Sequence, residues 1–114
     1  MRRDDAYLLD ILLAARRALE HIHGISREQF QSSELLQDAL VRPLEVIGEA
    51  AQRISDEYKE SHGEIPWFKM TGMRNRLIHE YFRVDYGAVW DTVQKDVPEL
   101  IDLILPLVPE DTDE

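Results

Sequence analysis

One short segment of the sequence concentrates side chains suited to proton transfer and phosphate binding. Arg74, Asn75, Arg76 and His79 all lie between positions 74 and 79. Histidine exchanges protons near neutral pH and can act as a general acid or base. Arginine offers a planar fork of N–H donors that fits phosphate oxygens. Such a set could help a ribose 2′-hydroxyl attack its own phosphodiester, with arginine stabilising the charge that develops in the transition state.

Helical spacing limits which of these side chains can meet. Asn75 and His79 are four residues apart and share one helix face, so Asn75 could hold the imidazole in one tautomer. Arg74 and His79 are five residues apart, about 140° around an ideal helix. They can converge because arginine is long, or because the helix loosens near its end. Such residues also commonly form salt bridges or polar packing, so spacing alone leaves catalysis and plain structure both open.

The charge distribution favours a confined anionic ligand. The chain has 114 residues, and 23 acidic against 13 basic residues give it a net charge of −10. An acidic protein disfavours non-specific binding to nucleic acid. The segment 69–83 has the opposite sign, with a net charge of +3 from one acidic and four basic residues, Glu80, Lys69, Arg74, Arg76 and Arg83. This basic island could equally pair with its acidic surroundings.

Features that the sequence lacks narrow the class of protein further. It has no cysteine, which excludes disulfides and cysteine-ligated metals, and no other metal-ligand pattern stands out. The start, Met1–Asp5, turns acidic at once, unlike an export signal. No run approaches the roughly 18 uninterrupted apolar residues of a membrane span. We therefore expect a cytoplasmic protein with no cofactor, no metal and no membrane attachment.

Apolar residues recur at spacings of three and four along most of the chain, which predicts helices, and no stretch alternates as a strand would. The first helix should run from Asp4 or Asp5, either of which could cap it, to His23. Gly24 should end it in the left-handed conformation. The spacing of Ser26 and Gln29 fits the capping box of a short helical turn.

A long second helix is expected from Ser33 to about Glu60. Pro43 should kink it, because proline has no N–H to donate to the preceding turn. Ala50 and Ala51 would allow a neighbouring helix to approach closely.

A third helix should begin with Pro66 at its first position and end near Tyr81 or Phe82. Its inward-facing residues should be Met70, Met73, Leu77 and Ile78. Asp85 should cap a fourth helix whose inner face carries Val89, Trp90 and Val93, and Pro98 should open a fifth. The result is an all-α fold, an antiparallel bundle of four to five helices that forms one domain over residues 1–108. Residues 109–114 are strongly acidic and should form a disordered tail.

The segment from Trp67 to Leu100, with the run WFKMTGMRNRLIHEYFRVDYGAVWD at 67–91, resembles the HEPN domain family, and within it the HepT-like toxins. The HEPN signature is an arginine, four to six residues and a histidine, which Arg74 and His79 match, with the polar Asn75 directly after the arginine. The HepT subgroup adds a tyrosine two residues past the histidine, here Tyr81. The run VIGEAAQRIS at 46–55 is similar to that subgroup's second long helix.

The resemblance implies a small, metal-independent endoribonuclease toxin of a type VII-like toxin–antitoxin system. It implies a homodimer in which Arg74 and His79 of both copies face a shared cleft, so that each copy supplies one histidine. The products would carry a 2′,3′-cyclic phosphate. The implied partner is an MNT-type nucleotidyltransferase antitoxin that transfers AMP onto Tyr81, where the added anion would repel RNA.

Two other interpretations use the same residues. The chain could be a non-catalytic subunit that binds nucleotide or RNA and presents Tyr81 to a nucleotidyltransferase. It could also be a plain helical oligomerisation module. Sequence alone does not separate the first of these from the ribonuclease.

Overall fold

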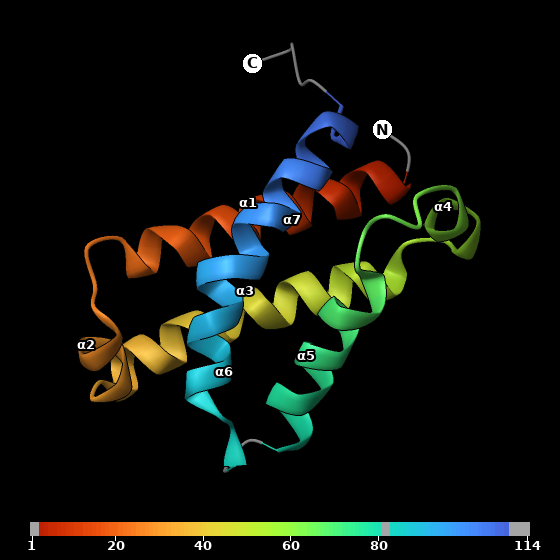
Figure 1. The fold of residues 1–114 in the computed structure, drawn as a ribbon. Coiled ribbons are helices and arrows are strands. Elements are labelled where there is room, and N and C mark those ends of the chain that lie inside the picture. Colours follow the sequence, from red (N-terminus) through yellow and green to blue (C-terminus); the bar gives the residue numbers. More distant parts are fainter. Residues whose placement is uncertain (1–2, 81–82, 110–114) are drawn as a thin grey trace.

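The computed structural model of the chain describes residues 3–80 and 83–109, and every regular element in these ranges is helical (Figure 1). The long helices α1 (Arg3–Ile22) and α3 (Glu34–Arg53) run in opposite directions and pack against each other. Helix α5 (Trp67–His79) packs on α3, and α7 (Val97–Ile104) packs on α1. The expected all-α bundle is therefore confirmed.

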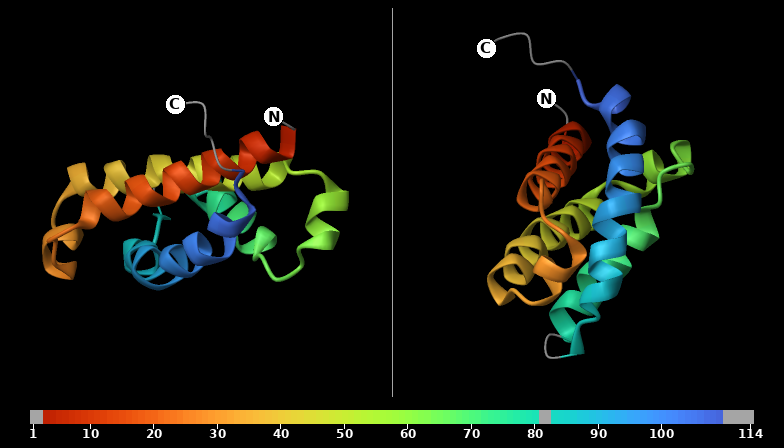
Figure 2. Two further views of the ribbon diagram at one scale, coloured as in Figure 1. Left: turned by 90° about the horizontal axis from the view of Figure 1, so that it is seen from above. Right: turned by 60° about the vertical axis from the view of Figure 1, so that its left-hand side comes forward.

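The bundle has two layers, which are visible from above in Figure 2. Helices α1 and α3 form one layer, and α5 together with the segment from α6 (Tyr86–Asp91) to α7 forms the other. The core fills the space between them with fully buried side chains from both layers, among them Leu8, Ile11, Leu40, Leu77, Val93 and Ile104. The position of α5 is thus set by apolar packing on α3.

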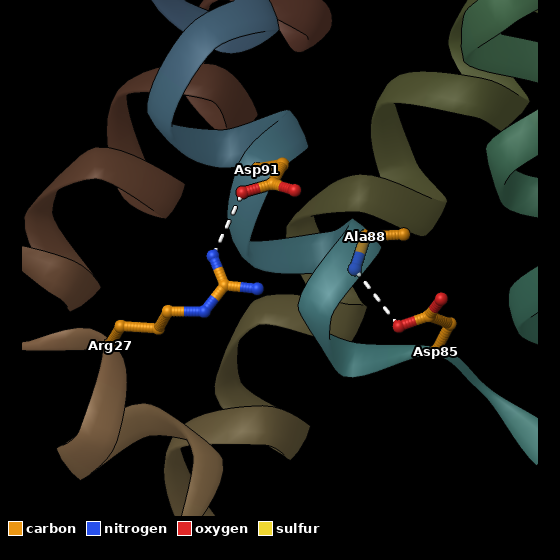
Figure 3. Close-up of polar contacts among 4 residues, drawn as sticks. All are labelled: Arg27, Asp85, Ala88 and Asp91. Carbon is orange, nitrogen blue, oxygen red and sulfur yellow. Dashed lines mark hydrogen bonds and ion pairs between the residues drawn. The ribbon is translucent and has the colours of Figure 1, made fainter.

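Local helix signals behave as the sequence predicts. Gly24 has φ +75°, the left-handed conformation, just after α1 ends. Ser26 accepts from the Gln29 N–H, and the Gln29 side chain accepts from the Ser26 N–H, which starts the short helix α2 (Arg27–Gln31) with a capping box. Asp85 accepts from the Ala88 N–H at 3.1 Å and caps α6 (Figure 3).

The predicted helix from Ser33 to Glu60 is wrong, because the chain turns at Ile54 and Ser55 and then starts the short helix α4 (Asp56–Ser61). The Ser55 N–H and hydroxyl both donate to the carboxylate of Asp4 in α1, at 2.9 and 2.7 Å. The Ser55 hydroxyl oxygen also accepts from the Tyr58 N–H and so caps α4. These bonds satisfy the backbone at the break and hold the corner of α3 and α4 against the start of α1.

Pro98 lies in the first turn of α7, which confirms a helix starting there, but no loop separates this helix from α6. Helices α6 and α7 are joined without a break by a π-helical turn, η2 (Thr92–Asp96), and a 3₁₀ turn, η3 (Leu105–Leu107), follows α7. In a regular α-helix the ring of Pro98 would clash with the carbonyl of Gln94. A wider turn just before the proline avoids this clash, and the Val97 N–H donates to the Thr92 carbonyl five residues back.

An ion pair ties α6 to α2. The Arg27 guanidinium lies 3.0 Å from the Asp91 carboxylate, and both side chains are about half exposed (Figure 3). Exposed pairs of this kind contribute about 0–1 kcal/mol, so this contact orients α2 more than it stabilises the fold.

Other predictions from the sequence concern single residues, the tail and a membrane span. Ile78 is 42% exposed and does not belong to the core. Pro66 is the residue before α5 and not its first helical residue, so the prediction was one position off. Tyr81, Phe82 and most of the predicted acidic tail lie outside the described residues. No helix in the described ranges is both long and apolar enough to cross a membrane.

Candidate functional site

Helix α5 carries the candidate residues, and its first turn is firmly anchored. The indole N–H of Trp67 donates to the His62 carbonyl at 3.0 Å. The rings of Trp67 and Tyr58 pack edge-to-face, with their centroids 6.2 Å apart. The Thr71 hydroxyl donates back to the Trp67 carbonyl. A buried Trp67 and these bonds fix the direction in which α5 leaves the loop.

Helix α5 approaches α3 closely at Gly48. A Cβ atom added at Gly48 would overlap the Cβ of Arg74 and would lie 2.7 Å from the Met70 carbonyl oxygen. No residue larger than glycine fits there without moving one of the helices. Arg74 is therefore held at its base by the contact between α3 and α5. Ala50 and Ala51, the small residues expected at a close helix contact, are both buried.

The guanidinium of Arg74 has little to bind within the described part of the chain. Its Nη1 donates to the Oδ1 of Asn75 at 3.2 Å, and its Nε is buried without a hydrogen-bond partner. No ion pair among the described residues includes Arg74, Arg76 or His79. The alternative in which these residues form salt bridges thus finds no support there. The guanidinium of Arg74 is thus not paired with a carboxylate in the described residues, and arginine is suited to bind phosphate oxygens.

The other candidates surround this arginine on different faces of α5. His79 is the last residue of α5 and is exposed. The contact found at Asn75, also exposed, is with Arg74 and not with the imidazole. Arg76 projects to another side, where it lines a cavity with Met73. The structure thus brings Arg74 and Asn75 together and shows no hydrogen bond between either of them and His79, and Tyr81 lies outside the described residues.

The described residues contain no cluster of three or more histidine, aspartate or glutamate side chains that could hold a metal ion. The side chains on α5 that can do chemistry include the exposed imidazole of His79 and the guanidinium of Arg74. An imidazole can move a proton, and the arginine can bind the oxygens of a phosphate.

Residues 11–107 match the family described as "Ribonuclease HepT-like". The chain belongs to the HepT-like ribonuclease family. A protein of Caldanaerobacter subterraneus subsp. tengcongensis, named "Putative RNase TTE0752", is 43% identical over 88% of this chain and 89% of its own. A Thermococcus cleftensis protein, named "Probable ribonuclease HepT", is 44% identical over 82% of this chain and 86% of its own. No solved structure matches the chain.

Membership of the HepT-like family confirms the resemblance drawn from the motif around Arg74 and His79. The sequence had not pointed to Gly48 as a site residue, although Gly48 lies within the HepT-like run at 46–55. Its signal was a glycine in the interior of a helix, which costs roughly 0.5–1 kcal/mol relative to alanine and needs a packing reason. The reason in this HepT-like chain is the contact with Arg74.

Proposed function

We propose that the chain is an endoribonuclease toxin that cleaves RNA without a metal ion, by attack of the ribose 2′-hydroxyl on the adjacent phosphate. The observation that carries the proposal is Arg74, a half-buried cation with an unused donor and no acidic partner in the described part of the chain. It lies on the same helix as the exposed His79, in a chain of a ribonuclease family.

In the proposed reaction His79 takes the proton of the 2′-hydroxyl, and the oxygen forms a bond to phosphorus. The bond from phosphorus to the 5′-oxygen breaks, and this oxygen takes a proton from a second group. The products end in a 2′,3′-cyclic phosphate and a 5′-hydroxyl. Arg74 binds the non-bridging oxygens, whose negative charge grows in the transition state. Asn75 holds the guanidinium through the bond it accepts from Arg74.

One copy of the chain supplies one motif histidine, so the second proton transfer needs another group. We propose a homodimer with two-fold symmetry, in which His79 of a second copy protonates the leaving oxygen. Ile78, 42% exposed beside His79, is an apolar contact available to such a partner. The dimer would also join two basic islands into one anion-binding groove.

Cleavage by the purified protein should continue at an unchanged rate in excess EDTA, because His79 and Arg74 supply both proton transfer and charge stabilisation. The measurement is the decay of a labelled RNA on a denaturing gel. The product ends provide a control, since a 2′,3′-cyclic phosphate is formed only by 2′-hydroxyl attack. Activity that is lost in EDTA and returns with a divalent ion would contradict the mechanism.

We propose that an MNT-type nucleotidyltransferase antitoxin silences the ribonuclease by transferring AMP from ATP onto Tyr81. Tyr81 follows His79 by two residues, so a bulky anion there would compete with RNA phosphate near Arg74. Incubation with such an enzyme and ATP should add mass in units of AMP and stop cleavage. Peptide mapping should place the mass on Tyr81, and Tyr81→Phe should stay unmodified and active. AMP found on a different tyrosine would overturn the regulatory proposal.

A further inference from the structure

A cavity of about 340 Å³ lies between α5, α3 and the segment formed by η2 and α7. Its floor is apolar and comes from the core, including Leu44, Ile47 and Leu100. Its rim on α5 carries Lys69 and Arg76. The proposed chemistry uses Arg74 and His79 and leaves this cavity without a role.

Phe68 stands on the rim of the cavity and is 89% exposed. It is the most exposed large apolar side chain in the described residues, and helix packing does not explain its type at this position. An exposed aromatic ring beside cations is typical of proteins that bind single-stranded nucleic acid, because every base can stack on such a ring. Stacking on Phe68 would place the edge of a base in the cavity.

The charges around the cavity indicate an anionic occupant that also has a hydrogen-bond donor. No ion pair in the described part of the chain includes Lys69, Arg76 or Asp96, although all three line the cavity. The two cations fit a phosphate. An ionised Asp96 carboxylate accepts hydrogen bonds and donates none. An exocyclic amino group of a base is a suitable donor for it.

Asp96 and Thr92 reach the cavity from the π-helical turn η2. Such turns are rare, and they occur frequently at functional sites because the wider turn changes the direction of its side chains. Here the two ends of the turn contribute a carboxylate and a hydroxyl to one wall of an otherwise apolar space. These polar groups could read the edge of a base that stacks on Phe68.

Arg76 is the candidate residue that lines the cavity, and it lies close to His79 along α5. Arg76 lines the cavity and precedes His79 by three residues, which is about 4.5 Å along the helix axis. A phosphate bound by Arg76 would therefore lie next to a phosphodiester at His79.

We propose that this cavity binds one base of the RNA next to the cleaved bond and selects bases that carry an exocyclic amino group. The base stacks on Phe68, its amino group donates to Asp96, and Arg76 and Lys69 bind its phosphate. The inference rests on the proposed function, since it assigns a binding site for the same RNA.

The test measures binding of short 2′-O-methyl RNAs, which cannot be cleaved, by fluorescence anisotropy. The wild type should bind oligocytidine more tightly than oligouridine, because uracil has no amino group. Phe68→Ala should weaken binding about tenfold or more, whereas Phe68→Trp should retain it because stacking is preserved. Asp96→Ala should remove the preference for cytidine, because alanine has no side-chain acceptor for the amino group. Leu35→Ala is the matched control, since Leu35 is 80% exposed on α3 and does not line the cavity.

Equal binding by the wild type, Phe68→Ala and Leu35→Ala would overturn the inference. A second result would also overturn it: light scattering shows that Phe68→Ala is a monomer where the wild type is a dimer, and the affinity for RNA is unaltered. The surface around Phe68 would then contact a second copy of the chain and not RNA. Failure of the proposed function has a different signature: base-selective binding would persist in a wild type that cleaves no RNA.

Discussion

Replacing His79 with alanine should abolish RNA cleavage and leave the fold intact. Loss of a general acid or base typically costs about 10²–10⁴ in rate. His79 is exposed at the end of α5, where substitutions change stability by only about 0.5 kcal/mol. The rate at which labelled RNA is cleaved should therefore fall sharply, whereas the melting temperature should hardly change. His21→Ala is the matched control, because His21 is another exposed histidine in the last turn of its helix.

Arg74→Ala should lower cleavage by about 10²–10³, the usual effect of removing a donor that stabilises charge in the transition state. Arg42→Ala, which removes an exposed arginine of α3, serves as the control for net charge. Should the His79 and Arg74 variants cleave as fast as the wild type, the catalytic assignment would be untenable. A wild type that binds RNA but never cleaves it would instead favour the non-catalytic partner subunit.

Gly48→Ala should both destabilise the protein and impair cleavage. The added methyl group would overlap Arg74 at its Cβ, and backbone and Cβ atoms cannot move aside as the end of a flexible side chain can. Overpacking of this kind costs about 1–3 kcal/mol. Because relief requires α5 to shift away from α3, the guanidinium of Arg74 should also lose its position.

Gly72→Ala is the matched control for this prediction. Gly72 is also a helical glycine, in α5, but an added Cβ there would meet nothing within 4 Å. Alanine in the interior of a helix is favoured over glycine by roughly 0.5–1 kcal/mol, so this variant should melt at a higher temperature than the wild type. Thermal melts of the two variants should thus shift in opposite directions. A Gly48→Ala protein as stable as Gly72→Ala would rule out the close contact.

Signals that act within a few residues could be predicted from the sequence. The left-handed Gly24, the capping box at Ser26 and the cap at Asp85 each depend on atoms no more than three residues away, and each is confirmed. The helical spacing of apolar residues likewise placed Arg74 and His79 on one helix correctly.

The features that were predicted wrongly or missed depend on contacts between residues that are distant in the sequence. The break after α3 is stabilised by Asp4, 51 residues before Ser55, so the continuous helical pattern from Ser33 to Glu60 was misleading. The role of Gly48 requires α5 to be packed on α3, which no local pattern reveals. Ile78 fits the helical period of a buried residue, yet the face it occupies is not covered by another described helix.

The π-helical turn also sets the rotational phase of the last helix. Between Val89 and Ile104, both buried, lie fifteen steps along the chain, which in an ideal α-helix would leave Ile104 about 60° out of alignment with Val89. The wider turn winds less per residue and so reduces this offset. Inserting or deleting one residue in this stretch would act as a rotation of about 100° and would turn Val97 and Leu100 away from the core. Changes in chain length, in evolution or in design, should therefore be tolerated in the loops and not between Tyr86 and Ile104.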